Sequence, residues 1–290
     1  MVSRQRATNP FFLFFFLRFG LGLNLSGRAV HIRRAIEIDG ERFECLELTP
    51  EHLLGRFLHG SEIRYAAMRL YVVGRIPIPL PVPKVAVVGT RKPSPEGIEL
   101  TKRLVRNLVK EGVTVVSGLA RGIDTVAHRT AIEEGGRTVA VLGTPLNAFY
   151  PPENRELQLR IMKEHMVISQ FPPGPPVTRR NFPTRNRTMA LISDATVIVE
   201  AGERSGTIYQ GLECLRLGRP LLIHASLKGL KWVRKMAEYG ARLIETADEV
   251  LEVLRHNWTY STSTNSPNSS NLACFSPAWS GSYTCPSRRT

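Results

Sequence analysis

Short apolar segments that alternate with helical patterns dominate the middle of this sequence. The first segment, Val85 to Val88, ends at Gly89 and precedes a stretch in which Leu100, Leu104 and Leu108 fall on one helical face. Similar apolar runs recur at 113–116, 138–142, 166–169, 196–199 and 221–224. Strands that are apolar along their whole length are buried on both faces, as in a parallel sheet covered by helices. We therefore expect an α/β fold with an extended Rossmann-like, doubly wound and mostly parallel sheet.

The extent of this pattern divides the chain into four parts. We expect a Rossmann-like domain over residues 84–254, preceded by a small N-terminal region and Pro-spaced linker over 31–83, in which 70–74 has the pattern of a strand. Residues 255–290 are rich in Ser, Thr, Asn and Pro and predict a disordered, low-complexity tail. Residues 1–30 contain an apolar run, 11–17, that is too short to span a bilayer, so we expect no stable membrane association. An extended start is preferred over a targeting role for this segment.

The charge of the chain favours a polyanionic partner without locating it. Lys and Arg number 39 against 25 Asp and Glu, which gives a net charge of +14. Such an excess attracts nucleic acid or an acidic membrane surface. Between Lys84 and Leu254, however, 25 basic residues face 18 acidic ones, so half of the excess lies in the two ends of the chain.

The cysteines argue against a disulfide framework and against a zinc site. The chain has four cysteines, far apart and without CxxC or Cys/His ligand spacing. A reducing cytoplasm fits this pattern best.

Ligands of doubly wound sheets bind at the carboxyl ends of the strands, which directs attention to the loops there. The first loop places Arg91 and Lys92 after Gly89, where a glycine permits close approach of the backbone. A tight turn with solvated charges is the alternative. The second loop, 117–124, enters a helix, and its exposed amides are expected to hold a phosphate.

A structural interpretation of the second loop competes with the phosphate-binding one. In this alternative Gly118 and Gly122 serve turn geometry, Asp124 caps the helix and His128 is an ordinary helical residue. We favour it for Asp124 and His128, because the sequence shows no nearby partner for acid–base chemistry.

The segment 179–187 combines positive charge with a stacking face. It contains four arginines, the aromatic Phe182 and no acidic residue. Arginine can clamp phosphates bidentately, and an aromatic ring stacks on an unpaired base of any sequence. Asn186 is expected to cap the helix that follows, whose positive end would reinforce anion binding. The alternative is a solvated basic loop with Phe182 in the core.

The fourth loop, 200–207, again joins a buried strand to a helix. Ser205, Gly206 and Thr207 are expected to present amides and hydroxyls to a phosphate at the helix start. Simple helix capping explains the same residues equally well.

Taken together, these loops resemble the DNA-processing protein A (DprA/Smf) family. The resemblance is carried in order by GTRKPSPEG at 89–97, SGLARGIDTVAH at 117–128, AVLGTPLNAFYPPEN at 140–154, FPTRNR at 182–187, SDATVIVEA at 193–201 and SGT at 205–207. It covers residues 84 to about 225.

The resemblance implies a dimeric Rossmann-like protein that binds single-stranded DNA, helps load a RecA-type recombinase during DNA uptake and recombination, catalyses no reaction and needs no cofactor. It also implies the residues that bind DNA. The phosphate-binding arginine of the first loop is Arg91, the second glycine-rich loop is matched by Gly118, Arg121 and Gly122, and the basic and stacking positions are matched by Phe182, Arg185, Asn186 and Arg187. With the cations and loops above, the predicted nucleic-acid site comprises Gly89, Arg91, Lys92, Gly118, Arg121, Gly122, Arg179, Arg180, Phe182, Arg185, Asn186, Arg187, Ser205, Gly206 and Thr207.

The sequence also departs from the family. Members often begin with a helical SAM-like domain and end with a winged helix, whereas residues 1–83 are too apolar and irregular, and 255–290 too polar, for either. DNA binding is therefore predicted more directly than recombinase loading or natural transformation.

Two other functional classes use similar loops. The related LOG-type phosphoribohydrolases cleave a nucleotide with a GGxGTxxE motif, but here Gln210 replaces the carboxylate, and an amide cannot act as a general base. A nucleotide-sensing module would use the same phosphate loops without needing the arginines around Phe182. A free nucleotide therefore stays open as an alternative ligand.

Overall fold

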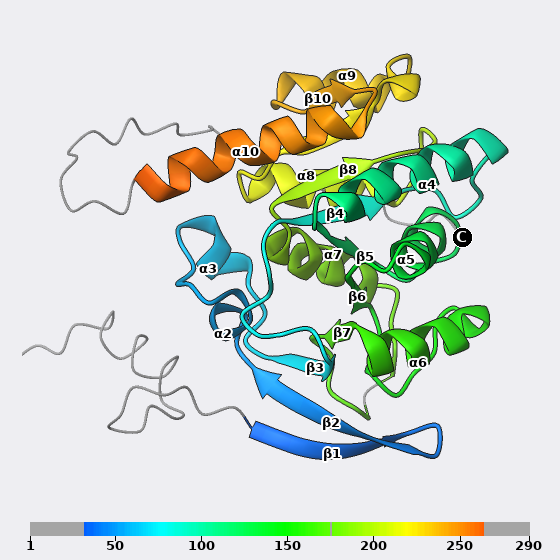
Figure 1. The fold of residues 1–290 in the computed structure, drawn as a ribbon, viewed down its shortest axis with the longest axis vertical. Helices are drawn as coiled ribbons and strands as arrows, with labels where there is room; N and C mark the ends of the chain where they lie inside the picture. The colour runs from blue at the N-terminus through cyan, green and yellow to red at the C-terminus, as the bar shows by residue number, and fades with distance from the viewer. Residues whose placement is uncertain (1–31, 175, 264–290) are drawn as a thin grey trace, which may run out of the picture. The chain divides into compact units, whose positions relative to one another are not determined.

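The computed structural model describes residues 32–174 and 176–263, with side chains described as far as His256 (Figure 1). The chain forms two units, 1–254 and 255–290. The sheet, the helices before α10 and the candidate site all belong to the first unit. The described residues form one ten-stranded sheet in the order β1-β2-β3-β7-β6-β5-β4-β8-β9-β10.

The core of the sheet is parallel, which confirms the expected fold class. Seven parallel strands run from β7 to β10 in the sheet order. They are β4 (Lys84–Val88), β5 (Thr114–Ser117), β6 (Thr138–Leu142), β7 (Met166–Ser169), β8 (Ala195–Ile198), β9 (Leu221–His224) and β10 (Arg242–Ile244). All apolar runs expected to be strands are strands. The strand order reverses between β4 and β8, and crevices for ligands open at such switch points.

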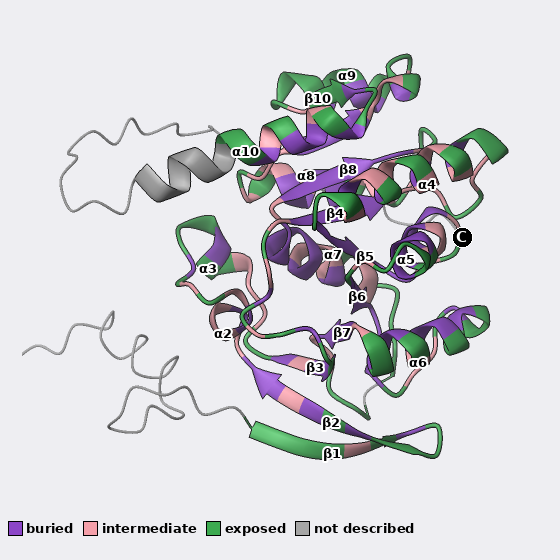
Figure 2. Cartoon of the chain, in the orientation of Figure 1, coloured by how far each residue is buried: buried purple, intermediate pink, exposed green. Residues whose placement is uncertain are grey.

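Helices cover both faces of the parallel strands, which Figure 2 shows as largely buried. They are α4 (Pro95–Lys110), α5 (Ile123–Glu133), α6 (Arg155–Glu164), α7 (Asn181–Ile192), α8 (Thr207–Arg216), α9 (Lys231–Glu238) and α10 (Ala247–Ser263), with short 3-10 turns η1 (Pro152–Asn154) and η2 (Ala225–Leu227). Neighbouring side chains of one strand face opposite layers. Val85 and Val87 of β4 join the apolar cluster of α4 and α5, whereas Ala86 and Val88 join that of α7 and α8.

The N-terminal region extends the same sheet with antiparallel strands. It contains β1 (Ile32–Ile38), β2 (Glu41–Leu48), α2 (Pro50–Leu54), α3 (Ser61–Tyr65) and β3 (Leu70–Gly74). β3, the strand expected at 70–74, pairs with β7, and β2 and β1 follow outward. Leu48, Leu53 and Leu70 belong to the same apolar cluster as Ala86. Residues of the expected small N-terminal region and linker thus pack in the same core as the main sheet.

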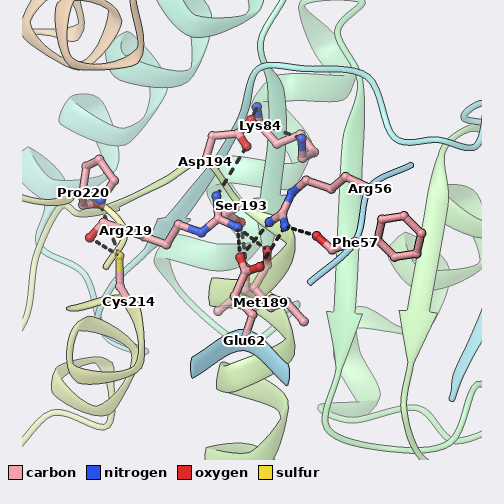
Figure 3. A network of polar contacts seen from close by, with 11 residues as sticks. Arg56, Phe57, Glu62, Lys84, Met189, Ser193, Asp194, Cys214, Arg219 and Pro220 are labelled. Atoms are coloured by element: carbon pink, nitrogen blue, oxygen red, sulfur yellow. Dashed lines mark hydrogen bonds and ion pairs between the residues drawn. The ribbon is translucent and has the colours of Figure 1, made fainter. Parts of the chain in front are cut away.

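A half-buried polar network joins α3 to the parallel core (Figure 3). The carboxylate of Glu62 accepts hydrogen bonds from Arg56, at 2.7 and 2.8 Å, and from Arg219 at 2.7 Å. Asp194 accepts from the backbone N–H of Lys84 at 2.8 Å and from its ammonium at 3.1 Å. The guanidinium of Arg219 lies 3.9 Å from Asp194 and thereby connects the two carboxylates.

Helix α10 continues into the segment expected to be a disordered tail, because it ends only at Ser263. The rest of that tail and the apolar run at 11–17 lie outside the described residues. Within the ranges that the structure describes, no helix combines the length and the apolar character needed to cross a bilayer.

Candidate nucleic-acid interface

The loop after β4 is held by backbone contacts that leave its cations exposed. The Thr90 N–H donates to the Glu200 carbonyl at 2.7 Å, and the Thr90 carbonyl accepts from Ile123 at 3.1 Å. Arg91 and Lys92 are exposed, and neither forms an ion pair with a described residue. The loop therefore presents two uncompensated cations at the carboxyl edge of the sheet.

Glycines make this close packing of loops possible. A Cβ on Gly89 would overlap the side chain of Ile123, and one on Gly122 would overlap the Thr90 carbonyl. Gly122 also has a φ of +78°, in the region that favours glycine. These predicted site residues thus set the path of the backbone, and α5 starts directly after Gly122.

Two amides of the second loop, which was expected to expose its amides, are bonded to a side chain of the protein. Asp124 is only 5% exposed, and its carboxylate accepts hydrogen bonds from the N–H groups of Gly118 at 3.1 Å and Ala120 at 3.3 Å. Burial raises the pKa of Asp124, against the opposing effects of Arg185 and the loop amides. Asp124 therefore folds the loop, and the expectation that it caps the helix is wrong, because the cap residue Gly122 has no side-chain partner.

Arg121 lies at the tip of the second loop and is already compensated. Its exposed side chain forms an ion pair with Glu153 of η1. The pKa of Arg121 is raised by the hydrogen bond to Glu153. A phosphate at this position would compete with that carboxylate.

The arginine-rich segment is helical for most of its length. Helix α7 begins at Asn181, so Phe182 lies in its first turn and Asn186 in its middle. The prediction that Asn186 caps the helix is therefore wrong. Arg179 and Arg180 occupy the exposed turn before the helix, and neither forms an ion pair within the described part of the chain.

Arg185 and Arg187 face the protein. Arg185 is only 6% exposed, and one of its guanidinium nitrogens donates to the carbonyls of Gly118 at 2.6 Å and Val141 at 2.7 Å. Burial lowers the pKa of Arg185, although Asp124 opposes this effect. Arg187 lies 3.4 Å from Glu213 and 5.5 Å from the centre of the Tyr65 ring. Two of the four predicted arginines are thus engaged within the fold.

Phe182 belongs to an aromatic pair at the end of β6. It is half-buried, packs so closely on Gly143 that a Cβ there would overlap its ring, and lies 5.2 Å from the ring of Tyr150 at a tilt of 50°. Tyr150 is 48% exposed and was missed in the sequence. The signal was present, because Tyr150 is an aromatic residue in a loop that follows a predicted strand.

The hydroxyl groups of the loop before α8 form hydrogen bonds within the protein. Ser205 Oγ accepts from the Thr207 N–H at 3.2 Å, and Thr207 Oγ1 donates to the Gly89 carbonyl at 2.9 Å. Gly206 is exposed at the start of the helix. One turn further, Gln210 is buried, and neither amide atom bonds to a described residue. The hydrogen bond from Thr207 to Gly89 joins the loops on the two sides of the switch point.

Comparison with known proteins decides the family. The model of the family described as DNA recombination-mediator protein A matches residues 58–255. The chain belongs to this family. It is 37% identical over 194 residues to the DNA processing protein DprA of Streptococcus pneumoniae, which covers 66% of this chain and 68% of that protein. Over 127 residues it is 46% identical to protein Smf of Synechocystis, covering 44% of this chain but 32% of that protein.

Solved DprA structures share the fold. The X-ray structure of DprA from S. pneumoniae has a TM-score of 0.58 at 35% identity and covers 64% of this chain and 66% of that chain. The structure of DprA from Helicobacter pylori, described for its single-stranded DNA binding mode, has a TM-score of 0.59 at 24% identity and covers 78% of this chain and 96% of that chain. Against this background, the predicted site of this DprA-family chain separates into exposed cations beside an aromatic pair and buried residues that shape the loops.

Proposed function

We propose that this protein binds single-stranded DNA along the carboxyl edge of β4–β7. The observation that carries the proposal is a group of exposed cations on the loops of this edge that have no acidic partner among the described residues: Arg91, Lys92, Arg179 and Arg180. They lie on loops at the edge where the exposed Tyr150 and the half-buried Phe182 form an aromatic pair. Cations bind the phosphates, and an aromatic face accepts an unpaired base. The single-stranded DNA binding described for H. pylori DprA supports this assignment.

The remaining predicted residues act on the shape of the site. Gly89, Gly118 and Gly122 permit the loops to approach one another. Arg185 connects the second loop to β6 through its hydrogen bonds to the carbonyls of Gly118 and Val141. Asn186 and Arg187 lie further along α7, and the Ser205–Thr207 loop is tied to Gly89. We assign these residues to positioning.

We extend the proposal to a wider role that the family resemblance supports. As a DNA-processing protein that holds a strand without reacting with it, this chain would act in recombination and DNA uptake, in the cytoplasm, as a homodimer that hands DNA to a RecA-type recombinase. The names of the relatives support DNA processing. Sedimentation of the purified chain, alone and with recombinase and DNA, tests the dimer and the transfer.

Nucleotide hydrolysis is the competing function, and Gln210 argues against it. The position that carries a carboxylate in LOG-type enzymes holds a neutral amide that is 1% exposed. Incubation with nucleoside monophosphates should release no free base. Measurable release would favour the enzyme.

Fluorescence anisotropy with labelled oligo-dT tests DNA binding. We expect salt-sensitive binding that prefers a single strand over duplex, and Arg91→Ala should weaken it about five- to tenfold, as expected for one lost phosphate contact of about 1–1.4 kcal/mol. Lys110→Ala is the matched control. It removes one exposed positive charge at the other end of α4, about 24 Å along the helix. Equal affinities of the two variants would contradict the site, and a folded protein that ignores oligo-dT at low salt would refute the function.

A further inference from the structure

The carboxylate of Glu200 occupies the start of α4. Both of its oxygens accept from the Ser94 N–H, at 3.1 and 3.2 Å, and one accepts from the Ser94 hydroxyl at 3.3 Å. Ser94 is the cap residue of α4, and its hydroxyl accepts from the Gly97 N–H at 3.0 Å. Glu200 thus ends a chain of hydrogen bonds that begins at the amides of the helix.

Gly97 shows how closely this carboxylate approaches the helix. A Cβ at position 97 would overlap Oε2 of Glu200. Position 97 is in the first turn of a sixteen-residue helix that follows the first parallel strand. Doubly wound folds hold the phosphate of a nucleotide at this place, because amides and the helix dipole converge there. In this protein a side-chain carboxylate takes the position of that phosphate.

The second glycine-rich loop repeats the arrangement. The buried carboxylate of Asp124 accepts from the N–H groups of Gly118 and Ala120. In both loops, backbone amides near the helix start are therefore bonded to carboxylates of the protein itself: Ser94 to Glu200, and Gly118 and Ala120 to Asp124. The exposed cations Arg91, Lys92, Arg179 and Arg180, in contrast, have no acidic partner among the described residues.

We propose that Glu200 determines the ligand class of the site by acting as a resident anion that excludes free phosphate groups from the start of α4. The protein then grips internal phosphodiesters through side-chain cations and takes neither a nucleotide nor the terminal phosphate of a strand at this helix. Of the two tests below, the one with pyrophosphate does not depend on the proposed DNA binding, whereas the one with oligo-dT rests on it.

Binding of inorganic pyrophosphate to the full chain gives the first test. By equilibrium dialysis the unaltered protein should show no saturable binding at millimolar pyrophosphate. Glu200→Ala should bind pyrophosphate saturably, with an affinity at least tenfold above the weakest that the assay detects for the unaltered protein. Glu203→Ala is the matched control, because it removes the same charge from the same loop, where Glu203 contacts Lys231 instead of α4. Equal binding by the unaltered protein, an equal gain in Glu203→Ala, or no gain in folded Glu200→Ala would each overturn the proposal.

A second variant keeps the proposal testable if Glu200→Ala does not fold. Glu200→Gln keeps the size of the side chain and removes its charge, so pyrophosphate should bind with a smaller gain and shift the amide resonances of Ser94 and Gly97. Unshifted resonances in this variant would count against the proposal.

Oligo-dT with and without a 5′-phosphate gives the second test. The unaltered protein should bind both forms equally, and Glu200→Ala should favour the phosphorylated form. A preference for the 5′-phosphate already in the unaltered protein would overturn the inference while leaving DNA binding intact. Absence of any oligo-dT binding would refute the proposed function, and the pyrophosphate assay would still decide the role of Glu200.

Discussion

The four arginines of the 179–187 segment look alike in the sequence but differ in the structure. Arg179 and Arg180 are exposed, whereas Arg185 and Arg187 contact the protein. The partners of Arg185 are carbonyls that lie 67 and 44 residues away in the chain. Local composition contains no information about such distant partners, so the sequence predicts the location of the site and not the role of each arginine.

Arg185→Ala should destabilise the fold strongly. The substitution removes a buried cation, leaves the Gly118 and Val141 carbonyls without this donor and deprives the buried Asp124 of its nearby positive charge. Breaking a buried charge pair costs about 3–5 kcal/mol. Urea denaturation should show this loss for Arg185→Ala and almost none for the exposed Arg91→Ala. Similar stabilities of the two variants would show that Arg185 does not brace the loops.

His128 should make stability depend on pH. Burial, with smaller effects of His165 and Arg185, lowers the pKa of His128 to about 3, and Nδ1 lies 2.7 Å from Thr138 Oγ1. In the unfolded chain His128 is protonated below about pH 6.5, whereas in the folded chain it stays neutral down to about pH 3. Stability from this residue is therefore lost as the pH falls through that window, at up to about 1.4 kcal/mol per pH unit.

His128→Asn keeps a polar atom near Thr138 and cannot titrate. Urea denaturation between pH 7 and 5, before most carboxylates are protonated, should show a shallower loss of stability in this variant than in the unaltered protein. Parallel pH profiles would mean that His128 binds its proton over the same pH range in the folded protein as in the unfolded chain. The pKa values of His165 and His224 are also lowered by burial, so a residual slope is expected in both proteins.

At the scale of elements, the sequence predicts six of the seven parallel strands because each of the six is a continuous apolar run. It misses β10, a three-residue strand that begins with the exposed Arg242. Helix α7 was expected to begin after Asn186, but it begins at Asn181, with Pro183 in its first turn. Proline lacks only an N–H that the first turn of a helix does not use, so it is tolerated there.

The β1–β2 hairpin escaped prediction for another reason. Residues 32–38 are mostly exposed, and the charged Arg33, Arg34 and Glu37 interrupt the apolar residues, so they form no apolar run. The connecting residues Asp39 and Gly40, with φ values of +57° and +75°, are a typical two-residue hairpin turn, and this signal was available in the sequence.

Gly40→Ala tests the contribution of this turn. An alanine Cβ meets nothing within 4 Å, so the cost comes only from the positive φ and should be about 1–2 kcal/mol of unfolding free energy. Gly202→Ala is the matched control, because its surroundings are equally open and its φ is outside the positive region. Thermal denaturation should show a lower midpoint for Gly40→Ala alone. A loss of equal size in both variants would assign the effect to something other than backbone conformation.

For the whole molecule, the position of charge matters more than its sum. The net charge is +14, yet arginines such as Arg56 and Arg219 serve the network around Glu62 that holds the N-terminal region on the core. Hydrogen bonds from Arg56 and His59 and the charge of Arg219 outweigh burial and lower the pKa of Glu62. These cations stabilise the fold and add little to the attraction of DNA.

The salt dependence of DNA binding should therefore report the few uncompensated cations on the loops of the candidate site and not the total charge. If about four cations contact phosphates, the logarithm of the association constant should fall with the logarithm of salt concentration at a slope of about −3, since each contact on a single strand contributes about −0.7. Arg91→Ala should make the slope shallower by about 0.7, while Lys110→Ala should leave it unchanged. Anisotropy titrations with oligo-dT between about 50 and 200 mM NaCl measure both slopes. A much steeper slope, shared equally by both variants, would mean that the whole basic surface attracts DNA and that the loop cations have no special part in binding.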